Sequence, residues 1–202
     1  MEQLTDCKRG DARRLQILAG AARCFCERGF HGASISQISK AAGMSPGHIY
    51  HYFDNKDAII GAIVAQDLEH RLALTEILRE VANTRCGLRA HVAQAITKQL
   101  DPYAAALKVE IVAEAGRNPK VAKIVRDADA VAREGLAAAI REIRSRSGFF
   151  DDEFIIDGVV ELFSALFAGV LIRSITNPAL DAEALTSRFV RIIEATLYAN
   201  EV

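Results

Sequence analysis

The chain has 202 residues, of which half are hydrophobic and a quarter are charged, and its formal net charge is −1 at pH 7. This length and composition are ordinary for a globular protein with one or two units and a real core. The near-zero net charge excludes a chain that is basic throughout, so any contact with nucleic acid must be local.

The charge is in fact uneven along the chain. Residues 1–56 hold eight Lys/Arg and five Asp/Glu, a local charge of +3 that leaves −4 for residues 57–202. Three of the five histidines also lie in this first segment. The basic bias is modest, but it favours the N-terminal quarter as a nucleic-acid contact.

Residues 1–10 contain Lys8 and Arg9 and precede the first helical pattern. We expect a flexible arm here, either a disordered tail or an arm that adds phosphate or minor-groove contacts. A first helix is predicted from about Asp11 to Arg28, with Gly29 at its end, because apolar residues then recur along one face. These apolar residues are Leu15, Ile17, Leu18, Ala21, Ala22 and Phe25.

Two short helix signals follow, on either side of a glycine-containing turn. Ser34 followed three residues later by Gln37 is a capping-box start. Gly43 can take the left-handed conformation that ends a helix, and Ser45 with Pro46 then supplies the next N-cap and first helical position. Helix, tight turn and helix is the arrangement that places a second helix in a DNA major groove.

The second of these helices has a surface that suits contact with DNA. Ile49 and Phe53 lie four residues apart and share one face, which can anchor the helix to the core. The remaining faces carry His48, Tyr50, His51 and Tyr52. Hydroxyl and imidazole groups can reach phosphates and base edges, so we interpret this segment as DNA-reading. The alternative is a compact surface corner with ordinary caps.

From Asp57 a longer helix is predicted to about Asn83, as a rigid connector to the rest of the chain. Beyond it every strong signal is helical, with breaks or caps at 83–87, 101–102, 118–119, 151–153 and 177–178. The total is about nine helices with no strand-hairpin signal. The predicted fold class is therefore all-α.

Residues Arg14 to Ile60 resemble the DNA-binding domain of the tetracycline-repressor (TetR) family. The most specific match is the run AGMSPGHIYHYFDNKD at 42–57. The rest of the chain is similar to the family only in length and helical pattern. The resemblance implies a helix-turn-helix DNA-binding domain at 1–56 and a helical ligand-binding and dimerisation domain at 57–202.

The predicted helix at 154–176 is apolar almost all round. A small domain cannot bury every face of such a helix against its own chain, so one face should meet a partner. With the apolar stripe of the last helix, it predicts a four-helix homodimer interface; the alternative is a central core helix. The interface residues that we predict are Val159, Phe163, Leu166, Val170, Phe189, Ile193 and Leu197.

The middle helices, 88–146, should enclose a ligand pocket if the resemblance holds. The candidate ligand-binding residues are His91, Gln94, Tyr103, Leu107, Glu110, Ile111, Glu114, Phe163 and Phe167. Glu110 and Glu114 lie four apart and share a face. Facing inward they would favour a cationic or hydrogen-bonding ligand, and facing outward they would form a solvated surface.

Together with these patterns, the resemblance implies a sequence-specific transcriptional regulator, a homodimeric repressor that binds a palindromic operator and responds to an unknown small-molecule effector. The candidate DNA-binding residues are Ser34, Gln37, Lys40, Ser45, Pro46, Gly47, His48, Tyr50, His51, Tyr52 and Lys56. Tyr50, His51, Tyr52 and Lys56 should mainly hold phosphates, and the others should lie near bases or backbone. Effector binding should change the spacing of the two reading helices.

Two other functional classes remain open. A DNA-bound adaptor could recruit a protein partner instead of sensing a small molecule. An enzyme is not expected, because no catalytic grouping, glycine-rich phosphate loop or metal spacing occurs, and we expect no cofactor.

Location and redox state follow from simpler signals. The most apolar run is interrupted by Asp157, Glu161 and Arg173, and nothing resembles a signal peptide, so we expect a cytoplasmic protein without a membrane span. Redox sensing through Cys86 or Cys7 is the alternative to the default, in which all four cysteines are free thiols without a metal. They are Cys7, Cys24, Cys26 and Cys86.

Overall fold

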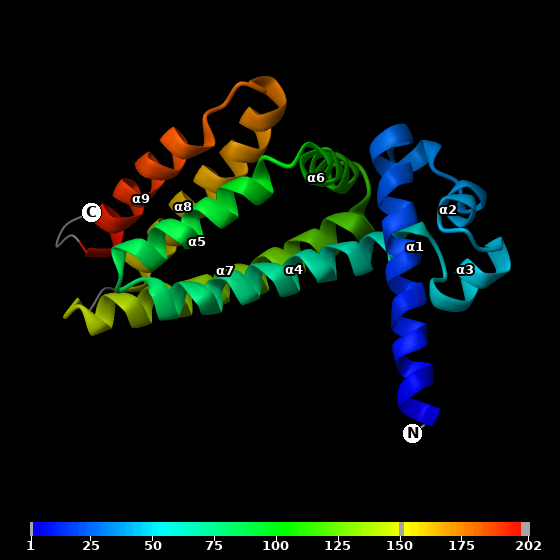
Figure 1. Ribbon diagram of the computed structural model, residues 1–202, viewed down its shortest axis with the longest axis horizontal. Helices are drawn as coiled ribbons and strands as arrows, with labels where there is room; N and C mark the ends of the chain where they lie inside the picture. The colour runs from blue at the N-terminus through cyan, green and yellow to red at the C-terminus, as the bar shows by residue number, and fades with distance from the viewer. Residues whose placement is uncertain (1, 150–151, 199–202) are drawn as a thin grey trace. The chain divides into compact units, whose positions relative to one another are not determined.

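The computed structural model describes the backbone of residues 2–149 and 152–198, and side chains from residue 10 onward within these ranges. This part of the chain forms nine helices and no strand (Figure 1), so the predicted all-α fold is confirmed. The helices are α1 (Glu2–Gly32), α2 (Ile35–Ala41), α3 (Pro46–Tyr52), α4 (Lys56–Val81), α5 (Arg85–Gln99), α6 (Pro102–Ala115), α7 (Pro119–Arg146), α8 (Glu153–Thr176) and α9 (Ala182–Tyr198).

Helix α1 begins earlier than the sequence pattern predicts. Its backbone is helical from Glu2, where an irregular arm was expected, because extending an existing helix adds one hydrogen bond for each residue fixed. The side chains of Lys8, Arg9 and Cys7 lie outside the described residues. At its other end α1 breaks at Gly29, which has φ 69° and ψ 166°, as the sequence predicts.

The chain forms two compact units, and each unit is built from two separate stretches of the sequence. One unit comprises Met1–Asp67 with Ala106–Asp127, and the other comprises Leu68–Ala105 with Ala128–Val202. Helices α4, α6 and α7 each contribute residues to both units. The helix-turn-helix segment is therefore packed together with parts of α6 and α7, which the sequence pattern did not indicate.

The core of the first unit joins α1, α2, α3 and the start of α4 to residues from α6 and α7. Ile17, Phe25, Ile38 and Ile49 are buried in the same cluster as Ile111. This unit is thus held by hydrophobic burial that reaches well beyond residues 1–56.

Helix α1 packs directly against the backbone at the end of α2, because Gly20 has no side chain. A Cβ atom at Gly20 would lie 2.9 Å from the backbone nitrogen of Ala42. Next to this crossing the Gln16 side chain donates a 2.7 Å hydrogen bond to the Ala42 carbonyl, and Arg23 donates to the Ala41 carbonyl. These contacts fix the turn that leads into α3.

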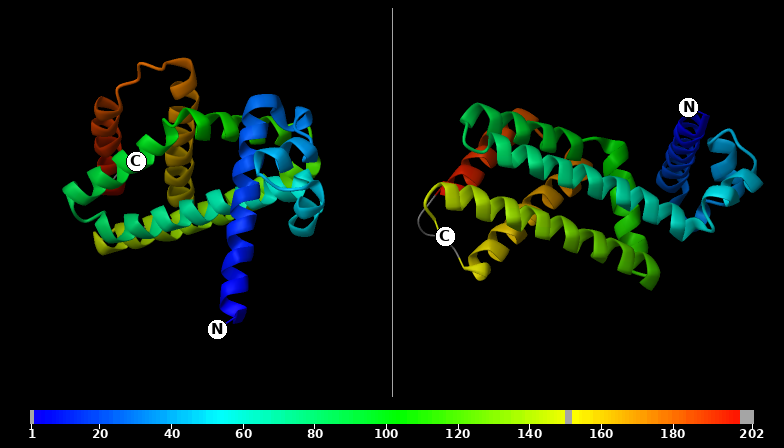
Figure 2. Two further views of the ribbon diagram at one scale, coloured as in Figure 1. Left: turned by 45° about the vertical axis from the view of Figure 1, so that its right-hand side comes forward. Right: turned by 90° about the horizontal axis from the view of Figure 1, so that it is seen from below.

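The second unit packs α5, α8 and α9 together with parts of α4 and α7 (Figure 2). Arg71 of α4 pairs with Asp129 of α7 at 3.2 Å, and a Cβ atom at Gly135 would lie 3.0 Å from Leu72. The α4 and α7 helices therefore run side by side in this unit, with a close approach at Gly135. Its core includes Val92, Ile96, Ile140, Phe163 and Leu197, among others.

Among the described helices, α8 is long and apolar enough to cross a membrane. This is weak evidence for a membrane span, because the core helix of a globular protein meets the same criteria of length and composition. One side of α8 is buried in the second unit, including Ile156, Val160 and Leu171. Its opposite side keeps several large apolar side chains exposed, among them Phe154 and Ile172. Part of this helix thus has no cover from its own chain.

Candidate nucleic-acid interface

The turn between α2 and α3 is built by the caps that the sequence predicts. The backbone nitrogen of Gln37 donates to the Ser34 hydroxyl at 3.2 Å, and the backbone nitrogen of Ser34 donates to the Gln37 side chain at 2.8 Å. Gly43 has φ 64°, in the left-handed region. The Ser45 hydroxyl then accepts from the backbone nitrogen of His48 at 3.3 Å, and α3 begins.

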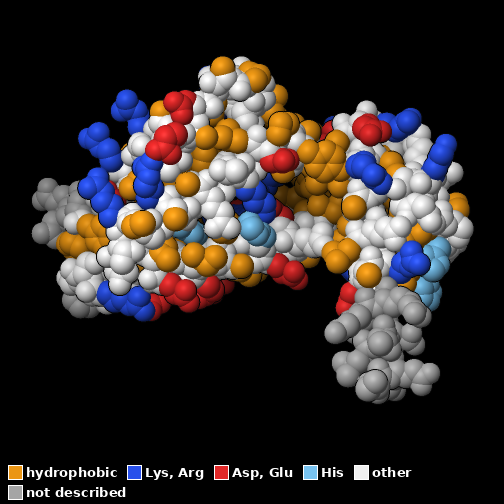
Figure 3. All heavy atoms as spheres, in the orientation of Figure 1, with side chains coloured by type: hydrophobic (Ala, Val, Ile, Leu, Met, Phe, Trp, Pro, Cys, Tyr) orange, Lys and Arg blue, Asp and Glu red, His pale blue; other side chains and the backbone are white. Residues whose placement is uncertain are grey.

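Helix α3 is anchored on one side and open on the other. Ile49 and Phe53 are buried in the core of the first unit, and the Arg14 guanidinium covers the Phe53 ring at 4.7 Å from its centroid. The Tyr50 side chain is 56% exposed. Figure 3 shows imidazole groups on this outer edge with Lys and Arg side chains nearby. The exposed candidates on the first turn are Ser45, Pro46, Gly47 and His48.

The rings on the outer side of α3 support one another. The His48 ring lies 5.5 Å from the Tyr52 ring and 6.4 Å from the His51 ring, and His51 meets Tyr52 edge-on at 5.2 Å between centroids. Such contacts restrict the rotamers of exposed side chains before any partner arrives. These imidazole and phenol groups therefore lose less conformational entropy when they bind a partner.

The remaining candidates from the helix-turn-helix segment are placed differently. Ser34 and Lys40 are exposed and Gln37 is half-buried in its cap. Lys56 does not project freely toward a phosphate: its ammonium donates a 2.7 Å hydrogen bond to the Phe30 carbonyl and lies 4.4 Å from the Phe30 ring centroid. Lys56 thus joins the end of α1 to the start of α4, and a phosphate would have to compete with that role.

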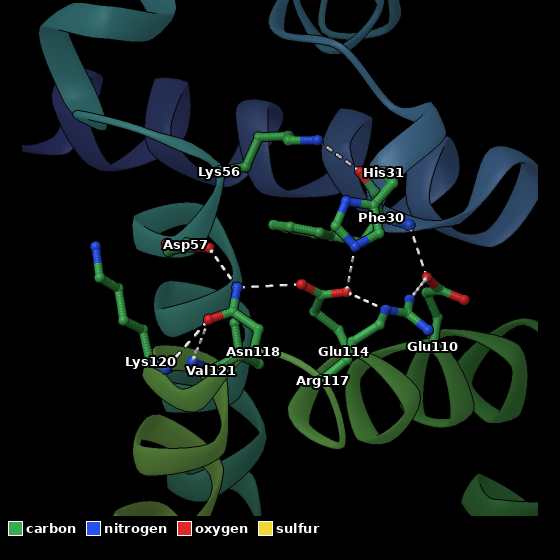
Figure 4. Close-up of polar contacts among 10 residues, drawn as sticks. All are labelled: Phe30, His31, Lys56, Asp57, Glu110, Glu114, Arg117, Asn118, Lys120 and Val121. Carbon is green, nitrogen blue, oxygen red and sulfur yellow. Dashed lines mark hydrogen bonds and ion pairs between the residues drawn. The ribbon is translucent and has the colours of Figure 1, made fainter.

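A polar junction connects α6 to the end of α1, and it was missed at the sequence level (Figure 4). Glu110 accepts a 2.7 Å hydrogen bond from the Phe30 backbone nitrogen, and Glu114 pairs with His31 at 3.1 Å. Arg117 bridges the two carboxylates, at 3.4 Å from Glu110 and 2.7 Å from Glu114. Glu110 and Glu114 share a face as predicted, but that face meets α1.

Glu114 is the buried centre of this junction, with no exposed surface. Asn118 donates to Glu114 at 3.1 Å and to Asp57 at 3.3 Å, which extends the junction to α4. Burial alone raises the pKa of Glu114, but the hydrogen bonds from Asn118 and Arg117 and the charges of His31 and Arg117 outweigh it, and the pKa lies below its ordinary value. The predicted solvated alternative is therefore wrong for Glu114.

The other candidate ligand residues are divided between the two units. Leu107 and Ile111 pack in the core of the first unit. In the second unit Phe163 is buried and Phe167 packs on the Phe189 ring, with 5.4 Å between centroids. The exposed candidates are Gln94 and Tyr103.

Among the candidate ligand residues, His91 has a buried nitrogen atom whose hydrogen-bonding capacity is not used. Its Nδ1 atom is buried without a hydrogen-bond partner. Burial lowers the pKa of His91, which favours the neutral imidazole. A surface hollow of about 730 Å³ lies elsewhere in the second unit, and its lining contains none of the predicted ligand residues. It is lined by Ala82, Asn83, Arg85, Ser147, Arg191, Glu194, Ala195 and Tyr198.

The predicted dimer residues are mostly core residues of the second unit, which corrects their assignment. Leu166 is half-buried, and the others are buried within the chain. They are Val159, Phe163, Val170, Phe189, Ile193 and Leu197. The apolar stripe of α8 that was chosen from the sequence faces α5 and α9, while the opposite side of α8, which includes Phe154 and Ile172, remains exposed.

Among the described side chains, Cys24 and Cys86 are free thiols. Burial raises the pKa of the Cys24 thiol, which disfavours the reactive thiolate. Among the described side chains no group of three His, Cys, Asp or Glu could hold a metal ion.

Comparison with known proteins agrees with this geometry. The family model described as bacterial regulatory proteins, tetR family, matches residues 17–63, and the model described as BetI-type transcriptional repressor, C-terminal, matches residues 84–197. The HTH-type transcriptional regulator UidR of Escherichia coli K12 is 34% identical over 140 residues, which cover 69% of this chain and 70% of UidR. The HTH-type transcriptional repressor AcnR of Corynebacterium diphtheriae is 36% identical over 76 residues, 34% of this chain and 40% of AcnR.

Solved structures show the same architecture. Salmonella enterica GusR superposes with a TM-score of 0.73 at 28% identity, covering 92% of this chain and 95% of GusR. A transcriptional regulator from Pseudomonas aeruginosa PAO1 reaches a TM-score of 0.75 at 22% identity, covering 95% and 92% of the two chains. With its helix-turn-helix segment and both family matches, the chain belongs to the tetR family of bacterial regulatory proteins and is a DNA-binding transcriptional regulator.

Proposed function

We propose that the protein is a cytoplasmic, homodimeric repressor that binds a palindromic operator and releases it when a small-molecule effector binds. Residues 1–56 would supply the DNA-binding domain and residues 57–202 the ligand-binding and dimerisation domain. The observation that carries the proposal is the outer side of α3, where His48, Tyr50 and His51 are exposed above a buried Ile49 anchor. Two such helices would enter successive major grooves about 34–36 Å apart.

A second copy of the chain is the partner that best fits the uncovered side of α8. Phe154, Gly158, Leu162, Ala165 and Gly169 are exposed and recur every three or four residues, so they share one face. A Cβ atom at either glycine would meet no atom within 4 Å, which leaves room for a close helix. A helix face of this kind can pack against its own symmetry mate in an isologous dimer.

The exposed face of α9 would complete that interface. Arg188, Ile192 and Ala195 are exposed on α9, and Asp157 is exposed on α8. An arginine on one copy can therefore face a carboxylate on the other, which favours a single pairing of the two α8–α9 layers. This four-helix arrangement keeps the predicted dimer but replaces the residues that form it.

The junction around Glu114 supports a route from the effector to the reading helix. Because α6 holds both the Phe30 nitrogen and the His31 ring, a displacement of α6 would have to move the end of α1 or break these contacts. An effector would lower DNA affinity only by binding one of these arrangements more tightly than the other. The unpartnered His91 Nδ1 is one group that a hydrogen-bonding effector could satisfy.

Selection of bound duplexes from a random DNA pool tests the proposal. We expect a palindrome with two half-sites, bound with a steep salt dependence that reflects several phosphate contacts. The selected duplex then serves as the probe for a screen of small molecules that release it. Recovery of only non-specific sequences would contradict the operator-binding repressor and favour the adaptor that recruits a protein partner.

A further inference from the structure

A hollow of about 730 Å³ lies at the end of the second unit where α4 and α7 finish, α5 begins and α9 ends (Figure 1). Its volume falls in the range of roughly 300–1,000 Å³ that is typical of small-molecule sites. Its lining contains none of the DNA-binding, ligand-binding or dimer residues that the sequence predicts. Neither operator reading nor the predicted effector pocket therefore accounts for it.

Hydrogen bonds from side chains to the backbone hold the walls of the hollow together. The Tyr198 hydroxyl donates to the Ala82 carbonyl, which ties the end of α9 to the end of α4. Burial raises the pKa of Tyr198, and the charge of Glu194 adds to this, so the phenol stays protonated and keeps the bond. The Arg144 guanidinium donates to the Thr196 carbonyl at 2.6 Å, which ties α7 to α9. A hollow with fixed walls loses little conformational entropy when a ligand binds.

The hollow carries an excess of positive charge. Its charged lining residues are Arg85, Arg191 and Glu194. The Nε atom of Arg85 lies 3.6 Å from Glu194, and this side chain is 80% exposed, so its two terminal nitrogens remain available. Arg191 is exposed, and within the described part of the chain its guanidinium has no ion-pair or hydrogen-bond partner. Two guanidinium groups beside one carboxylate favour an anion as the occupant.

The same hollow has an apolar side. Arg191, Ala195 and Tyr198 follow one another at spacings of four and three residues, so they share one face of α9. Ala82 lies across from this face, in contact with the Tyr198 hydroxyl. This arrangement suits a ligand with an anionic group at one end and a small apolar body at the other. Carboxylates, phosphate esters and sulfonates of that shape share this chemistry.

We propose that the hollow is a binding site for an organic anion with a small apolar body, separate from the site of the effector that releases DNA. Arg191 and the terminal nitrogens of Arg85 bind the anionic group, and the amide of Asn83, which also lines the hollow, donates to it. The apolar body packs on Ala195 and the Tyr198 ring. The site does not depend on operator reading, so it stands whether or not the protein is a repressor.

Solution NMR of the isotope-labelled full-length protein tests the site with benzoate, phenyl phosphate and the neutral amide benzamide. Benzoate and phenyl phosphate should shift the backbone amide signals of residues 82–85, 147 and 191–198 in a saturable way. Benzamide has nearly the shape of benzoate without its charge, so at equal concentrations it should leave these signals in place. Inorganic phosphate should bind several-fold more weakly than phenyl phosphate, because it lacks the apolar body.

Two substitutions should change the affinity for benzoate in opposite directions. Arg191→Ala should weaken binding roughly tenfold, because a hydrogen bond to a charged group is lost. Glu194→Gln should strengthen binding roughly two- to fivefold, because the carboxylate that competes for Arg85 is removed. A gain of affinity cannot come from misfolding, so this second variant tests the site even where the first is destabilised.

Arg126→Ala is the matched control. Arg126 is also an exposed arginine without an ion-pair partner in the described part of the chain, but it lies on α7, outside the hollow. This variant should keep the affinity of the wild type for benzoate.

Several results would overturn the site. They are no saturable shift with either anion, shifts confined to other residues, or unchanged benzoate affinity in a folded Arg191→Ala variant. Equal binding of benzamide and benzoate would overturn the choice of an anion, and equal binding of inorganic and phenyl phosphate would overturn the apolar body. None of these results bears on operator binding, which the selection of duplexes tests separately.

Discussion

At the scale of single residues, Glu114 shows how a carboxylate without exposed surface becomes part of a structural junction. It receives hydrogen bonds from Arg117 and Asn118 and lies 3.1 Å from the His31 ring. A buried charge with several donors is stabilising only while all of them are kept, since removing one partner leaves the others unsatisfied. The side chains at this junction therefore depend on one another.

Glu114→Gln should lower the free energy of unfolding by about 1–3 kcal/mol at pH 7, because the amide keeps its shape but loses the charge that Arg117 and His31 face. The folded pKa of Glu114 is lowered, so its charged form contributes fully above the ordinary value of 4.5, and the contribution is lost as the pH falls through the lower folded pKa. The difference in the free energy of unfolding between the Glu114→Gln variant and the wild type should thus become smaller at acidic pH. Urea unfolding at several pH values measures it.

Asp127→Asn provides the control for that experiment. Asp127 pairs with Lys123 on an exposed stretch of α7, and such i,i+4 surface pairs contribute about 0.3–0.5 kcal/mol. The Asp127→Asn variant should therefore lose little free energy of unfolding. A Glu114→Gln variant no less stable than this control would contradict the junction.

Tyr50 provides a second residue-scale prediction, which concerns DNA. Tyr50 is exposed, and we predict that its hydroxyl contacts a phosphate, so Tyr50→Phe should weaken binding to all duplexes by about the same factor. His48→Ala, on the same helix, should instead lose discrimination at particular base positions. Binding to a library of single-base operator variants distinguishes the two, and a base-selective loss for Tyr50→Phe would show that its role is misassigned.

At the scale of elements, much of the fold can be predicted from local chemistry. The serine caps, the proline at the start of α3 and the positive-φ glycine each act within a few residues, so the sequence predicts the helix-turn-helix and the helix count. The same is true of the break at Gly29. These features do not depend on which helices pack together.

What the sequence could not predict depends on packing between distant elements. The Glu110 and Glu114 pair was correctly placed on one face, but spacing along a helix does not reveal which neighbour that face meets. For α8, which is apolar almost all round, periodicity cannot distinguish the side buried by α5 and α9 from the side left exposed. The choice of Val159 and Phe163 as interface residues failed for this reason.

At the scale of the whole molecule, reading a palindromic operator requires two copies of the chain. Leu162→Arg should dissociate the proposed dimer, because it places a charge at the middle of the exposed apolar face of α8. Light scattering after gel filtration should give a mass near the chain mass of 22.0 kDa for the variant and about twice that for the wild type. Operator affinity should fall with dissociation, since a monomer holds only one half-site.

Val131→Arg is the matched control for this experiment. Val131 is also an exposed apolar residue, but it lies on α7, outside the proposed interface. Its arginine variant should remain a dimer. A monomeric wild type, or a Leu162→Arg variant with unchanged mass, would contradict the four-helix interface.

Two α3 helices held by one dimer should read two half-sites of an operator. The most direct test measures the affinity of the purified protein for the selected operator and for a version with about five base pairs, half a helical turn, inserted between the half-sites. The insertion moves one half-site to the opposite side of the duplex, so we expect specific binding to be lost and only salt-sensitive, non-specific binding to remain. Equal affinity for both duplexes would contradict a rigid dimeric reader.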